Sequence, residues 1–163
     1  MLKPARLYIV NLITGALPPT KFYSLKSSLY SWAGVELGKN VRIVSSVQIV
    51  GSGKLQIGDN TFIGHFSKII IGGSEVIIGE NVDISSNVTI INGTHQQHEF
   101  SDKAAGSGYS EPIIIENGSW IGASANLIAG AHISSLSIIG AGTTVYKRTR
   151  IRSTNVGASM REL

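Results

Sequence analysis

Aliphatic side chains recur every six positions over most of this 163-residue chain. A period of six does not match the 3.6-residue repeat of an amphipathic helix. It is a multiple of two, so each hexapeptide can hold one short strand whose aliphatic residue points inward. The repeated positions are Leu37, Ile43, Ile49, Leu55, Ile57, Ile63, Ile69, Ile78, Ile84, Ile90, Ile115, Ile121, Leu127, Ile133, Ile139 and Val145. Several such strands form one coil of the chain, and a single coil cannot bury its own aliphatic side chains. Successive coils must therefore stack on one another, and the pattern predicts an all-β solenoid.

Small residues accompany the aliphatic repeat. Gly directly follows the aliphatic residue in several hexapeptides, as at Gly58 and Gly122, and a small or β-branched residue stands four positions after it, as at Thr61 and Ala125. Gly suits tight turns, and a small inward residue fits a corner where a large one would not. Three strands per coil then give about five coils, which we expect to start at Leu37, Ile57, Ile78, Ile115 and Ile133.

Residues 1–34 lie outside this repeat and form a predicted helical cap. An apolar run, Leu7–Ile13, stands behind Lys3 and Arg6, but it is too short to span a bilayer and lacks a convincing signal-peptide cleavage site. We expect a short helix packed on the solenoid or on a neighbour. Peripheral membrane contact is the alternative.

A second helix is expected after Pro18-Pro19. From Phe22 onward, Leu25, Leu29 and Trp32 recur at three or four positions, and Gly34 ends the pattern. This helix should cover the open first coil, since the end of a solenoid exposes its core and its strand edges.

One segment, residues 96–111, interrupts the repeat on a large scale before Pro112 returns the chain to strand. It is rich in Gly, Ser and charged residues. Loops of this length inside a compact repeat are usually functional or disordered, so we look for chemistry beside it.

Composition narrows the chemistry. There is no Cys, which excludes disulfides and a thiolate nucleophile, and charged residues make up only 15% of the chain. The net charge of +4 is modest, but no Lys or Arg occurs between Lys103 and Lys147, after which basic residues cluster in the tail 146–163. The cluster favours a small polyanionic ligand over the alternative, a nucleic-acid-binding tail.

The repeat of aliphatic residue, Gly, two variable residues and a small residue resembles the hexapeptide-repeat acyltransferases over residues 35–163. The resemblance implies a left-handed parallel β-helix, and the handedness comes from the resemblance alone. It also implies acetyl-CoA as a co-substrate, no permanently bound cofactor or metal, and a homotrimer with active sites between subunits.

His95, within the run Asn92–His98, matches the histidine that acts as general base in the sugar and polysaccharide O-acetyltransferases of this family. The chemistry needs such a group, because a sugar hydroxyl must lose its proton as it attacks a thioester, and a neutral imidazole can accept that proton. With no Cys for a covalent intermediate, direct attack is favoured over a two-step route.

The acceptor contacts are less sharply indicated. His98 and Tyr109 share the loop with His95, and Glu75 lies about where relatives carry an acidic acceptor-binding residue. Ser67 stands where related enzymes place an Asn that holds the acceptor, so the identity of the acceptor cannot be carried over.

The run Ser119–Ala125 is similar to the family signature that lines the pantetheine arm of acetyl-CoA, which assigns Trp120, Gly122 and Ala123 to that role. The later stretch containing Ala141 resembles the part of the family that flanks coenzyme A. The basic residues Lys147, Arg148 and Arg161 are assigned to its phosphates. The chain departs from the family after Lys147, where relatives have Asp and Pro.

The sequence therefore predicts a cytoplasmic acetyl-CoA-dependent O-acetyltransferase, acting at the inner face of the membrane if the N-terminal segment binds there. Its acceptor would be a saccharide of capsule, exopolysaccharide or lipopolysaccharide type. N-acetylation of a nucleotide-linked amino sugar remains an alternative, as does a non-catalytic β-helix binding module. A zinc carbonic anhydrase is disfavoured because His95 and His98 have the wrong spacing for its three-histidine site.

Overall fold

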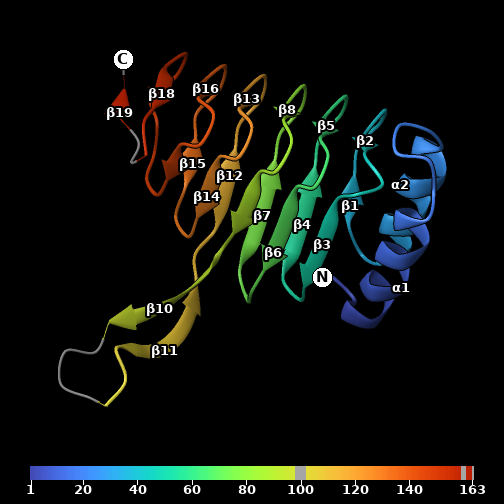
Figure 1. Ribbon diagram of the computed structural model, residues 1–163, viewed down its shortest axis with the longest axis horizontal. Helices are drawn as coiled ribbons and strands as arrows, with labels where there is room; N and C mark the ends of the chain where they lie inside the picture. Colours follow the sequence, from blue (N-terminus) through green and yellow to red (C-terminus); the bar gives the residue numbers. More distant parts are fainter. Residues whose placement is uncertain (98–101, 159–160, 163) are drawn as a thin grey trace.

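The computed structural model describes residues 1–97, 102–158 and 161–162, the last two as backbone only. Three parallel sheets run along a prism of stacked coils, with two helices at one end and a hairpin that projects from the middle (Figure 1). The chain visits sheets A, B and C in turn, so that each strand pairs with the strand of the neighbouring coil.

Sheet A contains β1 (Glu36–Leu37), β4 (Lys54–Ile57), β7 (Glu75–Ile78), β12 (Ile113–Ile115) and β15 (His132–Ile133). Sheet B contains β2 (Arg42–Ile43), β5 (Phe62–Ile63), β8 (Asp83–Ile84), β13 (Trp120–Ile121), β16 (Ile138–Ile139), β18 (Thr154–Val156) and β19 (Arg161–Glu162). Sheet C contains β3 (Gln48–Gly51), β6 (Lys68–Ile71), β9 (Thr89–Ile91), β14 (Asn126–Ile128) and β17 (Thr144–Val145).

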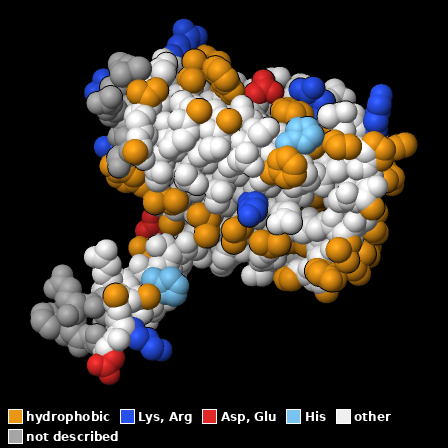
Figure 2. Space-filling view, in the orientation of Figure 1, with side chains coloured by type: hydrophobic (Ala, Val, Ile, Leu, Met, Phe, Trp, Pro, Cys, Tyr) orange, Lys and Arg blue, Asp and Glu red, His pale blue; other side chains and the backbone are white. Residues whose placement is uncertain are grey.

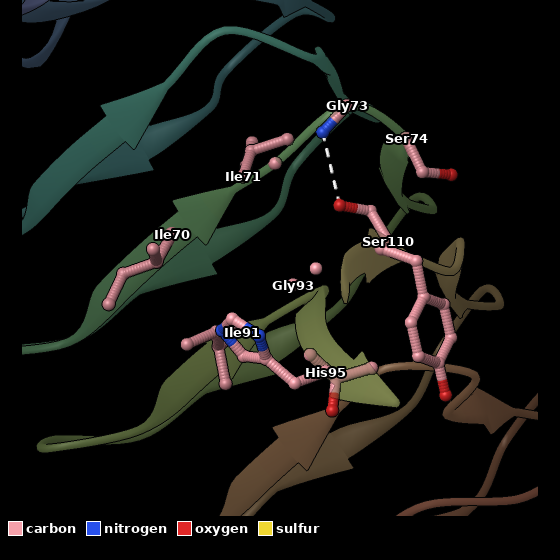
Figure 3. A pocket seen from close by; sticks show the side chains of 12 residues that line it. Ile70, Ile71, Gly73, Ser74, Ile91, Gly93, His95 and Ser110 are labelled. Carbon is pink, nitrogen blue, oxygen red and sulfur yellow. Dashed lines mark hydrogen bonds between the residues drawn. The ribbon is translucent and has the colours of Figure 1, made fainter. Parts of the chain in front are cut away.

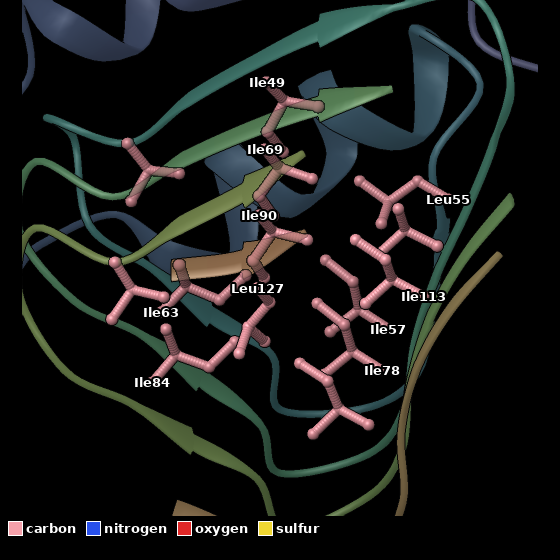
Figure 4. Close-up of a cluster of buried hydrophobic side chains, with 14 of the residues drawn as sticks. Ile49, Leu55, Ile57, Ile63, Ile69, Ile78, Ile84, Ile90, Ile113 and Leu127 are labelled. Atoms are coloured by element: carbon pink, nitrogen blue, oxygen red, sulfur yellow. The ribbon is translucent and has the colours of Figure 1, made fainter. Parts of the chain in front are cut away.

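The six-residue repeat is confirmed as the source of the core. Every aliphatic residue of the repeat is buried except Leu37, which is partly buried in the first coil. In sheet C, Ile49, Ile69, Ile90 and Leu127 stand in register in successive coils and form one continuous stack (Figure 4). Along each strand, successive side chains point alternately into the core and out to the surface, as the pleat of a strand requires.

Two helices cover the first coil. Helix α1 (Pro4–Gly15) begins with a proline, whose missing N–H costs nothing in the first helical turn, and α2 is Tyr23–Trp32. Lys26 of α2 is buried, and its ammonium donates hydrogen bonds to the carbonyls of Pro18 and Pro19 at 3.2 and 2.7 Å. Within the described residues, no helix is long and apolar enough to cross a membrane.

The segment predicted as a loop over residues 96–111 contains regular structure instead. Strands β10 (Gly93–Gln97) and β11 (Ala105–Ser110) pair antiparallel with each other and with no other strand among the described residues. The stacking of coils continues past this arm, since Ile113 of β12 lies in register with Val76 of β7. Sequence reasoning missed the hairpin because its Gly- and Ser-rich strands carry no inward aliphatic alternation.

The predicted tail also continues the solenoid. Strand β18 pairs in parallel with β16 in sheet B, and β19 returns antiparallel along β18. The polypeptide therefore begins a further coil before its end.

Candidate functional site

The hairpin β10–β11 is tied to the coils at its base. Asn92, fully buried, accepts a hydrogen bond from the Gly72 N–H at 2.7 Å and donates to the Glu75 carbonyl at 3.4 Å. Ser110 accepts a hydrogen bond from the Gly73 N–H at 3.1 Å. These contacts fix both strands of the arm to the turn between β6 and β7, and so position whatever the arm carries.

His95 lies on β10, opposite Gly108 of β11. Its Nδ1 is 3.0 Å from the carbonyl oxygen of Gly106. Because a carbonyl can only accept, Nδ1 carries the proton in the neutral ring, which leaves the Nε2 lone pair as the basic atom. The ring is exposed, so Nε2 is accessible to an incoming hydroxyl group.

A groove of about 790 Å³ opens beside His95. Three segments form its walls: the β6–β7 turn, the end of β9 with the start of β10, and the end of β11 (Figure 3). Figure 3 shows Ile91 and His95 on one side of the hollow, with Gly73, Ser74 and Ser110 on the other. The lining residues are Ile70–Ser74, Ile91, Gly93–His95 and Gly108–Ser110. Backbone amides, two serines and one histidine beside aliphatic walls suit an uncharged, hydroxyl-rich molecule.

Only some of the predicted acceptor residues belong to this groove. Tyr109 lines it and is 44% exposed. Glu75 follows the lining residue Ser74 but lines a smaller depression, together with Gly53 and Lys54. The prediction for His98 lies outside the described residues.

Ser67 is a correction. It is buried, and its hydroxyl donates to the Ser85 carbonyl at 2.9 Å and accepts from the Val88 N–H at 3.2 Å. Both bonds join successive coils at a corner. The side chain is therefore unavailable to an acceptor, and its smallness serves the corner.

Trp120 lies on the outer face of sheet B, far along the chain from the His95 groove and on a different sheet. Its ring is 52% exposed, and its indole N–H donates to the Ser85 hydroxyl at 3.3 Å. Trp120 pairs with Asp83 and Ile138 in the neighbouring coils. Trp120 is not among the residues that line the groove beside His95.

The small residues beside Trp120 divide into two kinds. Ala123 and Ala141 are exposed at one corner in successive coils, where the Gly142 N–H donates to the Ala123 carbonyl at 2.9 Å. Gly122 is buried, and its N–H donates to the Ile139 carbonyl at 2.7 Å. Gly122 therefore forms part of the corner, and its contact with coenzyme A stays a prediction.

The predicted phosphate-binding residues are placed differently from one another. Lys147 is exposed, with its ammonium 5.6 Å from the ring centroid of Tyr146. Arg148 is exposed too, but its guanidinium lies 3.6 Å from a carboxylate oxygen of Glu116. Arg161 belongs to β19, and its side chain lies outside the described part of the structure.

Glu116 is a polar centre that sequence reasoning missed. It accepts hydrogen bonds from the N–H and the hydroxyl of Ser135 at 2.9 and 2.7 Å, and from His132 Nε2 at 2.6 Å. These bonds, the Ser135 hydroxyl first, lower the pKa of Glu116 to about 2. No sequence signal marks the cluster, because its members come from coils up to 19 residues apart.

We searched the described residues for side chains that could together bind a metal ion. Within residues 1–97 and 102–158, no three His, Cys, Asp or Glu side chains lie close enough to share an ion.

Asn92 and Ser110, which hold the hairpin, are further residues that the sequence did not indicate as part of the site.

The sequence matches a family model of hexapeptide-repeat proteins over two segments. Residues 54–92 and 112–147 match the family model of the hexapeptide repeat of succinyl-transferase, with the β10–β11 arm as the gap between the two matches. The parallel sheets fit the left-handed β-helix of this class.

Relatives define the family more closely. The chain is 34% identical over 123 residues to galactoside O-acetyltransferase from Escherichia coli K12, a match that covers 75% of this chain and 59% of that protein. It is 30% identical over 135 residues to the putative colanic acid biosynthesis acetyltransferase WcaF of the same strain, covering 81% and 70%. The chain belongs to the hexapeptide-repeat acetyltransferases, in the group of sugar O-acetyltransferases. It spans less than two thirds of the length of the galactoside enzyme.

A solved structure has the same fold. A hexapeptide-repeat acetyltransferase from Vibrio cholerae O1 biovar eltor, solved in complex with acetyl coenzyme A, superimposes with a TM-score of 0.78 at 19% identity. The match covers 98% of this chain and 85% of that one.

Proposed function

We propose that this protein is an acetyl-CoA-dependent O-acetyltransferase that acetylates a saccharide hydroxyl, with His95 as the general base. The observation that carries the proposal is the hydrogen bond from His95 Nδ1 to the Gly106 carbonyl, because it fixes the tautomer whose Nε2 accepts a proton. The family membership supports the reaction class. The galactoside relative supports a sugar as the acceptor, and the relative named for colanic acid biosynthesis supports a capsule, exopolysaccharide or lipopolysaccharide unit.

In the proposed reaction, the acceptor lies in the groove beside His95 with its hydroxyl hydrogen-bonded to Nε2. The oxygen attacks the thioester carbonyl as Nε2 removes the hydroxyl proton, and the C–S bond of the tetrahedral intermediate then breaks. The imidazolium returns its proton to the leaving thiolate, so the base is regenerated and free coenzyme A departs. Tyr109, on the rim of the groove, is placed to contact the sugar.

We further propose that each active site lies between two copies of the chain in a homotrimer. In one chain Trp120 does not line the groove beside His95, so we expect a neighbouring chain to supply one of the two residues. An outward row of aliphatic residues on sheet C, Val50, Ile70, Ile91 and Ile128, borders the groove and supports such packing. In this arrangement the neighbour's Trp120, Ala123 and Ala141 would line the pantetheine arm, and Lys147 would meet the phosphates.

The remaining finer features of the proposal concern the fold and the compartment. The five strands of sheet A support about five coils, and the family supports their left-handed course. The use of acetyl-CoA supports a cytoplasmic reaction.

The first test follows thiol release from acetyl-CoA with a panel of mono-, oligo- and nucleotide-linked sugars. His95→Ala should lower turnover by about two to four orders of magnitude, the usual worth of general base catalysis. His65→Ala is the matched control, because His65 lies within hydrogen-bonding distance of Ser46, does not line the groove and should leave turnover intact. Unchanged turnover in His95→Ala would show that His95 is not the general base. Turnover with amino sugars alone would replace the hydroxyl acceptor by an amine.

A second test addresses the shared site. His95→Ala and Trp120→Ala chains should each be nearly inactive, but refolding an equal mixture should restore intact pairs of His and Trp at roughly one quarter of the interfaces, since each partner is intact half the time. A mixture that forms hybrid trimers yet stays inactive would exclude a site built from His95 of one chain and Trp120 of another.

A further inference from the structure

Helix α1 buries Leu7, Val10 and Thr14 against the first coil and leaves a second set of apolar side chains exposed. Asn11 donates to the Ile49 carbonyl at 2.9 Å and accepts from the Ile49 N–H at 3.3 Å. Thr14, fully buried, lies 3.4 Å from the hydroxyl of Tyr30. The helix is thus held to the first coil by these polar contacts as well as by the buried Leu7 and Val10.

The outward face of α1 carries Tyr8, Ile9, Leu12 and Ile13, which are 43–68% exposed. At 100° per residue these four side chains fall on one side of the helix, with the small Ala5 and Ala16 between them and no charged residue on that arc. Figure 2 shows orange side chains gathered at the helical end of the molecule. We call Tyr8, Ile9, Leu12 and Ile13 the α1 outer face.

Trp32 of α2 adds an aromatic residue at this end. It is 48% exposed, the guanidinium of Arg6 stacks 4.7 Å from its ring centroid, and Arg6 also donates to the Trp32 carbonyl at 3.1 Å. The contact holds a cation and an indole together at the end of α1. Trp, Tyr and Arg are the side chains that favour the boundary between lipid headgroups and acyl chains.

The charge of the N-terminal helical segment has one sign. Residues 1–35 contain Lys3, Arg6, Lys21 and Lys26 but no Asp or Glu. Lys26 is engaged internally by two carbonyls, while Lys3 and Lys21 are exposed. An apolar face flanked by basic residues, with no acidic residue near it in sequence, is complementary to an anionic surface.

We propose that the α1 outer face docks this protein on an anionic phospholipid membrane, with Lys3, Arg6 and Lys21 contacting headgroups and the aliphatic side chains entering the interface. The charge decides between this occupant and a second copy of the chain. Two copies meeting through the same end would bring like charges together, whereas acidic headgroups neutralise them. Docking through this end leaves the hairpin β10–β11 clear, since it projects from the middle of the solenoid (Figure 1).

The test is flotation of the full-length protein with vesicles of phosphatidylglycerol and phosphatidylcholine, compared with pure phosphatidylcholine. Each exposed basic residue near an anionic surface contributes about fivefold in binding, so the wild type should bind the mixed vesicles on the order of tenfold or more tightly, and high salt should weaken that binding. The double variant Ile9→Gln, Leu12→Gln should lower binding by about tenfold or more, because two aliphatic side chains no longer enter the interface.

Ile151→Gln is the matched control, since Ile151 is 64% exposed in the C-terminal coils, at the other end of the solenoid. It should bind vesicles as the wild type does. Gln is a good helix former, and thermal melts of both variants verify that the fold is kept. In a Trp120→Phe background Trp32 is the sole tryptophan, and its emission should shift to the blue on adding anionic vesicles.

Two outcomes would overturn the proposal. One is equal flotation of the wild type and the folded double variant, or no flotation at all. The other is a doubling of the assembly's mass without lipid that the double variant abolishes, which would assign the α1 outer face to a second copy. These readouts do not involve acetyl-CoA, so they stand or fall separately from the enzymatic assignment.

Discussion

Asn92 offers a sharp test of how the coils position the β10–β11 hairpin. The side chain is fully buried where β9 passes into β10, and it accepts from the Gly72 N–H at 2.7 Å. Asn92→Ala removes this acceptor and the weaker donation to the Glu75 carbonyl at 3.4 Å. A good hydrogen bond is worth about 1 kcal/mol, and the unpaired donor and lost packing add a similar amount, so the free energy of unfolding should fall by about 2 kcal/mol.

The loss should be visible in both stability and activity. For a chain of this size, 2 kcal/mol corresponds to a fall in Tm of about 4–8 °C. Because the same contact ties the hairpin to the coils, kcat should drop on the order of tenfold while the KM for acetyl-CoA stays constant. Amide hydrogen exchange in β10 and β11 should accelerate relative to that in β12.

The control for this variant is Asn126→Ala. Asn126 occupies sheet C two residues after a corner, and its amide makes a single contact at 3.5 Å with the Ser124 carbonyl. It should change Tm by less than about 2 °C. Equal behaviour of the two variants, or a fall in Tm of Asn92→Ala with unchanged kcat and hairpin exchange, would refute the reasoning.

Three further predictions test separate parts of the structure. The pKa of Glu116 in the folded protein, about 2, lies below its ordinary value of 4.5, so its stabilisation is present above pH 4.5 and is lost as the pH falls through 2. Allowing for its partial exposure, Glu116→Gln should lower the free energy of unfolding by about 1–2 kcal/mol at pH 7 and flatten its decline between pH 4.5 and 2 in urea titrations. Gly122→Ala places a Cβ 2.6 Å from the Ala141 nitrogen and should cost about 1–3 kcal/mol, whereas Gly15→Ala, with nothing within 4 Å, should gain about 0.5–1 kcal/mol. Lys147→Ala should raise the KM for acetyl-CoA about tenfold or more with little change in kcat, measured by thiol release at saturating acceptor.

Each of these has a contrary result. A urea titration in which wild type and Glu116→Gln lose stability in parallel below pH 4.5 would show that the carboxylate is not linked to folding. A normal Tm with a raised KM for acetyl-CoA in Gly122→Ala would indicate that Gly122 contacts the coenzyme and is not needed for the corner. An unchanged KM in Lys147→Ala would remove that lysine from the phosphates.

The fold was largely readable from the sequence because its information is local and repeated. One aliphatic residue per hexapeptide specifies an inward strand, and the phase is kept long enough to specify a stack. The two helices were also predicted near their observed bounds, from Leu7–Ile13 and from the spacing of Leu25, Leu29 and Trp32. The hairpin was not, since its two strands are held by pairing with each other and by Asn92, rather than by any periodic apolar pattern.

The candidate site residues also fall into those that the sequence indicated and those that only the folded chain revealed. Short motifs within a recognisable repeat were enough to identify the family and to indicate His95 and Trp120 as candidates. The folded chain was needed to show that Ser67 and Gly122 serve the corners, that the Gly106 carbonyl fixes the His95 tautomer, and that Glu116 accepts hydrogen bonds from Ser135 and His132. The physical reason is that hydrogen bonds and close packing depend on atoms brought together across coils. A hexapeptide records which way its side chain points, but not what the next coil places against it.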